Sequence, residues 1–146
     1  GVRVYDDFAH HPTAVRETLS GLRARHPEGK LVAVFEPRSA TASRRLHQGG
    51  YEDAFYSATL AILAPVGRTS IPEAEKLDVA AVAEALRARG IDALAPGSLD
   101  AVLDVVVAAV GEGDTIVLMS NGDFGGLHDR VIAALALPGK RTDDAR

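Results

Sequence analysis

LVAVF at Leu31–Phe35 and TIVLM at Thr115–Met119 are the two stretches of this sequence that indicate its fold. Each is a short, almost uninterrupted apolar run that ends at polar residues. A run of this kind is typical of a strand buried on both faces, as strands are in a parallel sheet covered by helices. We therefore expect a buried parallel sheet at the centre of the molecule.

Strand and helix patterns alternate on both sides of these two runs. Pro12 suits the first position of a helix, and Asp78 and Ser98 suit helix N-caps. Further strands are expected at residues 2–5, Leu60–Leu63 and 91–94, and helices over residues 12–25, 46–56, 79–89, 99–110 and 127–137. This alternation predicts an α/β fold, a three-layer sandwich on a mostly parallel sheet, as one domain over residues 1–146.

Length and composition restrict the class of protein. The chain has 146 residues, 47% of them hydrophobic and 25% charged, which is close to the globular average. Its net charge of −4 argues against a protein that coats nucleic acid, and the lack of Cys excludes a disulfide framework or a catalytic thiol. Neither a secretory signal nor a stretch long enough to span a membrane is recognisable. We expect a soluble, cytoplasmic domain.

The first residues, GVRVYDD, begin a strand pattern at once and without Met. We therefore expect the chain to be part of a longer protein. The phosphate-binding pattern G-x-x-x-x-G-K-[ST] is absent, because Leu31 and Arg141 follow the two Gly-Lys pairs. If the protein uses ATP, its triphosphate must be bound by another part of that longer protein.

Three loops with unusual chemistry follow strands of the predicted sheet, at residues 6–11, 36–45 and 120–126. Ligands of such folds bind beyond the carboxyl ends of the strands. Because the carboxyl ends of parallel strands meet at one edge, the three loops predict a single composite site.

The first loop contains Asp6, Asp7, His10 and His11. A carboxylate here can accept hydrogen bonds from ribose hydroxyls, and a helix N-terminus favours an anion. A purely local alternative is that Asp6 or His11 caps the following helix while His10 is exposed to solvent. A metal site made of all four side chains is a weaker alternative, because adjacent residues of an extended loop point apart.

The second loop contains Arg38, Ser39 and Thr41, followed by two further arginines. The guanidinium group of Arg38 could hold a carboxylate or phosphate through two parallel hydrogen bonds, with the two hydroxyl groups as additional donors. The alternative is a solvated surface loop, because exposed arginines often have no specific partner.

The third loop is a glycine-rich turn that starts with Ser120, Asn121 and Gly122. Its backbone N–H groups could face a phosphate or a carboxylate. It lacks the spacing of the dinucleotide fingerprint, and Leu118 stands where a nucleophile elbow has its first glycine. A serine hydrolase is therefore disfavoured.

Taken together, YDDFAHHPTAV at residues 5–15, VFEPRSAT at residues 34–41 and MSNGDFGGLH at residues 119–128 resemble the C-terminal domain of the Mur ligases. These are ATP-dependent, amide-forming enzymes of peptidoglycan synthesis. The resemblance extends from residue 2 to about residue 137, and the three motifs occur in the family's order.

The resemblance implies a dinucleotide-fold-like last domain of a three-domain enzyme. The missing first domain would bind the UDP-sugar, and the missing central domain would hold the ATP phosphates and Mg²⁺. The last domain would close over ATP and contain neither catalytic residues nor metal ligands. By motif match, Asp7, His10 and His11 would bind the nucleotide. The substrate-binding residues would be Arg38, Ser39, Thr41, Ser120, Asn121 and Gly122.

Within the family, F-E-P-R-S and S-N-G-x-F-G-G resemble the branch that joins L-alanyl-γ-D-glutamyl-meso-diaminopimelate, a murein tripeptide, to UDP-N-acetylmuramate. The branch that uses L-alanine typically has Q-P-H-R-Y-T-R after this strand, and it remains the alternative. This sequence departs from the tripeptide branch at Ala40, usually Asn, and at Asp123, usually Gly. Outside the family, a stand-alone nucleotide- or small-molecule-binding α/β module and a metal-dependent hydrolase remain alternative hypotheses.

Overall fold

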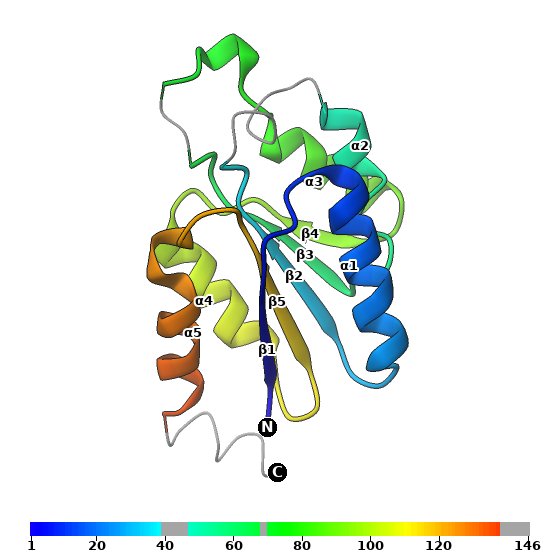
Figure 1. The fold of residues 1–146 in the computed structure, drawn as a ribbon, viewed down its shortest axis with the longest axis vertical. Helices are drawn as coiled ribbons and strands as arrows, with labels where there is room; N and C mark the ends of the chain where they lie inside the picture. Colours follow the sequence, from blue (N-terminus) through cyan, green and yellow to red (C-terminus); the bar gives the residue numbers. More distant parts are fainter. Residues whose placement is uncertain (39–46, 68–69, 138–146) are drawn as a thin grey trace.

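A computed structural model describes residues 1–38, 47–67 and 70–137. In these residues strands and helices alternate along the chain (Figure 1). The strands are β1 Arg3–Asp7, β2 Leu31–Phe35, β3 Leu60–Leu63, β4 Asp92–Leu94 and β5 Thr115–Met119. The α-helices are α1 Pro12–Arg25, α2 Gln48–Glu52, α3 Val79–Ala88, α4 Leu99–Ala109 and α5 Leu127–Leu135. Two single 3-10 turns are η2 Glu73–Glu75 and η3 Phe124–Gly126.

The described strands form one parallel sheet in the order β1-β5-β2-β3-β4. The last strand in sequence is thus inserted between the first two. In the register of the sheet, Met119 pairs with both Asp7 and Phe35, so β1, β5 and β2 end at the same level. The prediction of a parallel sheet is confirmed.

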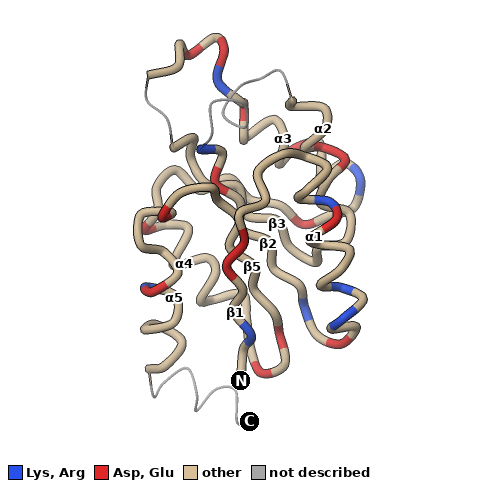
Figure 2. The backbone as a smooth tube through the Cα atoms, viewed as in Figure 1, with Lys and Arg blue, Asp and Glu red and all other residues tan. Residues whose placement is uncertain are grey.

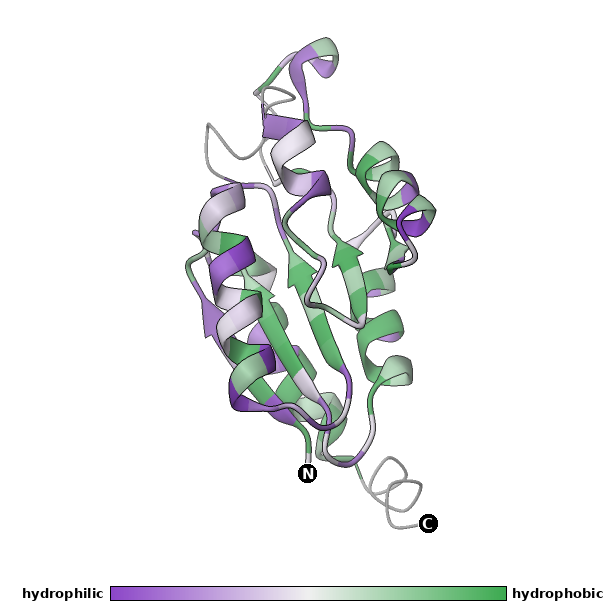
Figure 3. Cartoon of the chain, turned by 90° about the vertical axis from the view of Figure 1, so that its right-hand side faces the viewer, coloured by the Kyte–Doolittle hydropathy of each residue, from purple (hydrophilic) through white to green (hydrophobic). Residues whose placement is uncertain are grey.

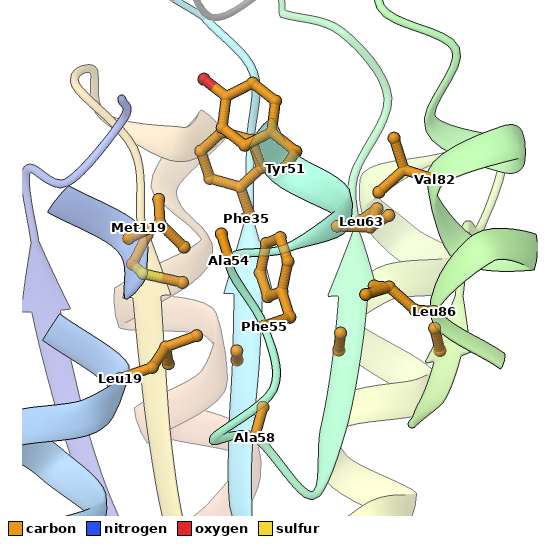
Figure 4. Packing of buried hydrophobic residues seen from close by; sticks show 14 of the residues in the cluster. Leu19, Phe35, Tyr51, Ala54, Phe55, Ala58, Leu63, Val82, Leu86 and Met119 are labelled. Carbon is orange, nitrogen blue, oxygen red and sulfur yellow. The ribbon is translucent and has the colours of Figure 1, made fainter. Parts of the chain in front are cut away.

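Helices cover both faces of the sheet, which confirms the three-layer sandwich. On one face, α1, α2 and α3 pack through residues such as Leu19, Tyr51 and Leu86 (Figure 4). On the other face, α4 and α5 pack through Val106 and Val131. The strands between the layers are mostly apolar, whereas polar residues gather on the outer surfaces of the helices (Figure 3).

The predicted helix starts are confirmed by their capping bonds. Asp78 accepts a hydrogen bond from Ala81 N at 3.0 Å, and Ser98 accepts one from Ala101 N at 3.1 Å. Pro12 is the first residue of α1, where a missing N–H leaves no bond unmade.

Two predicted boundaries are wrong. Strand β1 does not end at residue 5 but continues through Asp6 and Asp7, because both residues pair with β5 and this pairing outweighs the low strand propensity of aspartate. Helix α2 has 5 residues instead of the span 46–56, of which Leu46 lies outside the described residues. The chain beyond α2 turns and buries Phe55 against Phe35 instead of continuing the helix. Other ends differ by one or two residues.

The strand order places a change in the direction of the connections on each side of β5. After β1 and β2 the chain leaves toward the face covered by α1 and α2, whereas after β5 it leaves toward the face covered by α5 (Figure 1). Neighbouring strands whose connections leave to opposite faces form the usual binding crevice of open α/β sheets. The fold therefore places a candidate site around the carboxyl end of β5.

Candidate functional site

Residues 6–11, 36–38 and 120–126, which are the described parts of the three loops singled out in the sequence, meet at this edge of the sheet. Ser120 N donates to Asp7 O at 3.1 Å, and Glu36 N donates to Met119 O at 3.0 Å. The chain that leaves β5 is therefore hydrogen-bonded on one side to β1 and on the other side to β2. The site is composite, and its central element is β5.

The loop after β1 is organised by short-range side-chain contacts and by one hydrogen bond from the distant Tyr51. Asp7 Oδ1 accepts a hydrogen bond from Ala9 N at 2.7 Å, and the Nδ1 atom of His10 lies 2.9 Å from Phe8 O. Tyr51 donates its hydroxyl proton to His10 O, and burial raises the pKa of Tyr51, which keeps that proton in place. The Asp7 carboxylate is thus held in one orientation at the sheet edge.

His11 is the N-cap of α1, as the local alternative predicts. Its Nδ1 atom accepts a hydrogen bond from Thr13 N at 3.2 Å, so this nitrogen is unprotonated. The ring also meets the ring of His47 edge-on, with centroids 5.1 Å apart. The same alternative predicts that His10 is exposed, whereas the structure shows it partly buried.

Asp6 and Asp7 lie next to each other on β1 and therefore face opposite sides of the sheet. Asp6 faces α5, where its Oδ2 atom is 3.8 Å from Nδ1 of His128, and it does not cap α1. The four side chains of the metal hypothesis are thus divided between the two faces. No group of three His, Asp or Glu residues in the described parts of the chain is arranged to hold a metal ion.

A buried polar pair joins the ends of β2 and β5. Glu36 and Ser120 are 4% and 3% exposed, and Ser120 Oγ donates to Glu36 Oε1 at 2.7 Å. The same Oγ accepts a hydrogen bond from Gly122 N at 3.1 Å. Glu36 therefore lies at the candidate site, although no role was predicted for it from the sequence. The feature of the sequence that could have indicated Glu36 is a carboxylate directly after a fully buried strand.

Arg38 is exposed and lies across the glycine-rich loop. A Cβ atom at Gly122 would overlap Cδ and Nε of Arg38, and one at Gly67 would lie 3.3 Å from its Cγ. Beside Arg38 is an open hollow of about 390 Å³. The hollow is lined by Glu36, Arg38, Pro65, Val66, Gly67, Gly97, Ser98, Leu99, Asp123 and Gly125.

The glycine-rich loop uses several of its own donors. Gly125 N donates to Asp123 Oδ1 at 3.1 Å, and Gly126 N donates to Asp123 O at 3.0 Å. The backbone turns through positive φ at Phe124, Gly125 and Gly126, and the two glycines adopt this conformation without strain. Asp123 therefore forms the turn, and these two N–H groups are already engaged within the loop.

Two predicted site residues, Ser39 and Thr41, lie outside the described residues, as do Ala40, Arg44 and Arg45. Asn121 is described and exposed. Acidic and basic segments are mixed at the upper edge of the sheet in Figure 2, so this edge does not carry one sign of charge. None of the described helices is both long and apolar enough to pass through a membrane.

Comparisons with known proteins place this site in a family. The family described as "Mur ligase, glutamate ligase domain" matches residues 1–122. UDP-N-acetylmuramate–L-alanyl-γ-D-glutamyl-meso-2,6-diaminoheptandioate ligase of Escherichia coli is 39% identical over 137 residues, which are 93% of this chain and 28% of the relative. UDP-N-acetylmuramate–L-alanine ligase of Xylella fastidiosa is 30% identical over 139 residues, 90% of this chain and 28% of the relative. The chain thus spans little more than a quarter of such relatives.

Solved structures agree with these relatives. The murein peptide ligase of Psychrobacter arcticus matches with a TM-score of 0.75 at 30% identity, over 92% of this chain and 27% of that one. A single domain of a Haemophilus ducreyi protein, assigned as a ligase of the diaminopimelate type, matches with a TM-score of 0.70 at 30% identity. That match covers 92% of both chains. From the matched motifs, the family profile and these relatives, the chain belongs to the Mur ligase family and corresponds to its C-terminal domain.

Proposed function

We propose that this chain is the C-terminal domain of a longer ATP-dependent ligase that joins the tripeptide L-alanyl-γ-D-glutamyl-meso-diaminopimelate to UDP-N-acetylmuramate. The main support is the Glu36-Pro37-Arg38 sequence at the end of β2, which is typical of tripeptide ligases and borders the hollow beside β5. Identity to tripeptide ligases of 39% and 35% also exceeds the 30% found with the Xylella L-alanine ligases.

On this proposal, the loop after β1 contributes to ATP binding. Asp7 is partly buried and oriented by its bond with Ala9 N, which suits a carboxylate that accepts hydrogen bonds from ribose. His10 and His11 flank it. Mg²⁺ and the triphosphate would be bound by the central domain, and Mg²⁺ would there neutralise charge on the phosphates.

The loops after β2 and β5 contribute to peptide binding. The tripeptide bears several carboxylates, and a guanidinium group such as that of Arg38 can bind one of them through two parallel hydrogen bonds. Ser39, Thr41 and Asn121 would add polar contacts around it, and Ser120 and Gly122 would complete this side of the site.

The implied reaction is acyl activation followed by amide formation. The carboxylate of UDP-N-acetylmuramate attacks the γ-phosphorus of ATP and releases ADP, and the amino group of the tripeptide then displaces phosphate from the acyl phosphate. This domain would orient the peptide and exclude water when it closes over ATP, which lowers the barrier without a chemical step of its own.

The alternative substrate is L-alanine, since the Xylella relatives carry that name. The test is to incubate the full-length protein with ATP, Mg²⁺, UDP-N-acetylmuramate and either nucleophile, and to identify the product by mass spectrometry. We expect the tripeptide adduct. Formation of the L-alanine adduct alone would replace the proposed substrate and leave the family assignment intact.

The chain on its own is expected to be inactive. With both substrates and ATP, it should release no phosphate above a blank, because the phosphate-binding loop is absent from its sequence. It should bind ATP only weakly, since it supplies part of the contacts. A submicromolar dissociation constant by calorimetry would contradict a site shared between domains.

Reading the coding sequence upstream of Gly1 provides an independent check, because it should encode a phosphate-binding loop and not a start codon.

A further inference from the structure

We propose that Glu36, Ser120, Gly67 and Gly122 are positioning residues that fix the direction of the Arg38 guanidinium group. Arg38 would then bind a carboxylate of the ligand from a preformed orientation and not as a mobile surface side chain. This inference rests on the proposed function only for the identity of the ligand. The positioning itself can be measured without any substrate.

Two glycines form the walls against which Arg38 lies. Its Cγ atom is next to Gly67, and its Cδ and Nε atoms lie directly on Gly122. A Cβ atom at Gly122 would overlap those atoms, whereas carbon atoms in contact are about 3.5–4.0 Å apart. No other residue type at position 122 leaves room for this path of the arginine. The slot between the two glycines is therefore required for this path of the Arg38 side chain.

A directed hydrogen-bond chain holds one wall of the slot in place. Gly122 N–H can only donate, so Ser120 Oγ accepts from it and must give its own proton to Glu36 Oε1. The carboxylate of Glu36 is buried, and its Oε2 atom would lie 3.1 Å from a Cβ atom at Gly67. The Glu36 carboxylate thus lies beside Gly67 and is linked through Ser120 to Gly122, and it connects loops that are 84 residues apart in sequence.

The Gly122→Ala substitution tests the slot directly, because it displaces Arg38 without adding charge or removing a donor. The guanidinium group must move by on the order of 1 Å, and misplacement of this size costs up to about 100-fold in rate. In the full-length protein we expect kcat/KM for the tripeptide to fall by about 10- to 100-fold, mainly through KM, with KM for ATP unchanged. Gly21→Ala on α1 is the matched control, because a Cβ atom there meets nothing within 4 Å.

A double-mutant cycle separates positioning from general damage. If Gly122 acts through Arg38, then Gly122→Ala combined with Arg38→Ala should be no worse than Arg38→Ala alone. Additive losses would overturn the proposal. If Gly122→Ala alone does not fold, the double variant should fold again because the overlapping side chain is gone. Failure of that rescue would also overturn it.

The hydrogen-bond chain has its own variants. Glu36→Gln retains an oxygen that can accept a hydrogen bond from Ser120, so it should lose much less of the tripeptide kcat/KM than Glu36→Ala does. Glu36→Ala and Ser120→Ala should reproduce much of the Gly122→Ala effect. Equal losses for Glu36→Gln and Glu36→Ala would show that charge, and not the directed hydrogen bond, is what matters, and would overturn the proposed chain.

A measurement on the chain alone keeps this inference separate from the proposed function. A Haemophilus ducreyi domain of matching extent has been solved by itself, so such a domain folds without its partners. In nitrogen-15 spectra of this chain, the Nε–H signal of Arg38, assigned through Arg38→Lys, should be shifted by Gly122→Ala and not by Gly21→Ala. Exchange of the Gly122 amide proton should be faster in Ser120→Ala. An unshifted signal would overturn the positioning role, whereas a shifted signal without tripeptide ligation would refute only the proposed substrate.

Discussion

The loop after β1 and the pair of loops after β2 and β5 lie at the same edge of the sheet but are held together differently. In the first loop, the bonds of Asp7, His10 and His11 join residues two positions apart. In the second region, Glu36 bonds to Ser120 across 84 residues of sequence, and Arg38 lies on Gly122. In one half of the site the side-chain bonds are therefore local, although Tyr51 and Ser120 also donate to backbone oxygens of this loop, whereas the other half exists only when the sheet is assembled.

This difference predicts how each half responds to substitution. Changes in the local half should alter one contact at a time. Changes in the assembled half should propagate, because its residues depend on one another. The predictions below begin with the largest expected effect.

Arg38 should give the largest effect, because it carries the substrate assignment in the assembled half. In the full-length protein, Arg38→Ala should weaken transition-state binding with the tripeptide by about 2–5 kcal/mol if the ion pair is desolvated in the closed enzyme. Arg38→Lys retains the charge but loses the paired donors, so it should also impair use of the tripeptide. Tripeptide saturation curves measure both effects.

ATP kinetics and thermal stability should stay near wild type in both Arg38 variants, because the residue is an exposed loop residue outside the core. Normal tripeptide kinetics in both variants would refute a role of Arg38 in tripeptide binding. A large fall in melting temperature would instead assign it a structural role.

Asp7 tests the local half. In the full-length protein, Asp7→Ala should raise KM for ATP by the equivalent of about 1–3 kcal/mol, the range for losing a charged hydrogen-bond partner, with a smaller effect on the tripeptide. Asp7→Asn is the matched control, because its side-chain oxygen can still accept from Ala9 N while the charge is lost. Unchanged ATP kinetics together with altered metal dependence would favour the metal hypothesis.

The Asp114→Ala variant tests whether a long-range contact away from the candidate site affects stability alone or also substrate kinetics. It lies at the opposite edge, where Lys30 N and Gly111 N each donate to its buried carboxylate at 2.8 Å. Asp114→Ala should lower the free energy of unfolding by about 1–3 kcal/mol because two backbone donors lose their partner. Denaturant unfolding of the chain measures this loss.

Asp100 provides the control for this comparison. It forms an exposed ion pair with Arg130, so Asp100→Ala should lower the free energy of unfolding by less than about 1 kcal/mol.

Substrate kinetics in the full-length protein should be unaffected by Asp114→Ala. A specific loss of tripeptide binding in Asp114→Ala would contradict the view that the edge at the carboxyl ends of the strands is functional and the opposite edge is structural.

His11 should give the smallest effect. Its ring nitrogen caps α1 through a single 3.2 Å bond, so His11→Ala should cost about 0.5–1 kcal/mol, or a few degrees in melting temperature. His11→Asn places a preferred N-cap residue at the same position and should restore that stability. If Asn destabilises the chain as much as Ala does, the capping bond does not account for the loss.

The sequence predicted those features of the fold that depend on residues close together in the chain. The buried strands Leu31–Phe35 and Thr115–Met119 were predicted to the residue, as were the caps at Asp78 and Ser98. Apolar runs and capping side chains act over a few residues, so one stretch of sequence contains the whole signal. The three matched motifs also identified the family before any geometry was known.

The wrong predictions concern element boundaries that depend on contacts with residues distant in sequence. The paired aspartates were expected to end β1, but hydrogen bonding to β5 carries the strand through them. Helix α2 was expected to be longer, but the burial of Phe55 against Phe35 turns the chain away. In both cases a partner remote in sequence overrides local propensity.

The sequence by itself determined the elements, the family and the residue types that the site can use. Only the tertiary structure decided that β5 lies between β1 and β2, that Asp6 and Asp7 face different layers, and that Glu36 bonds to Ser120. The physical reason is that helix and strand preferences come from contacts within a few residues. The neighbours of Arg38 instead depend on which strands pair after the chain has crossed the sheet.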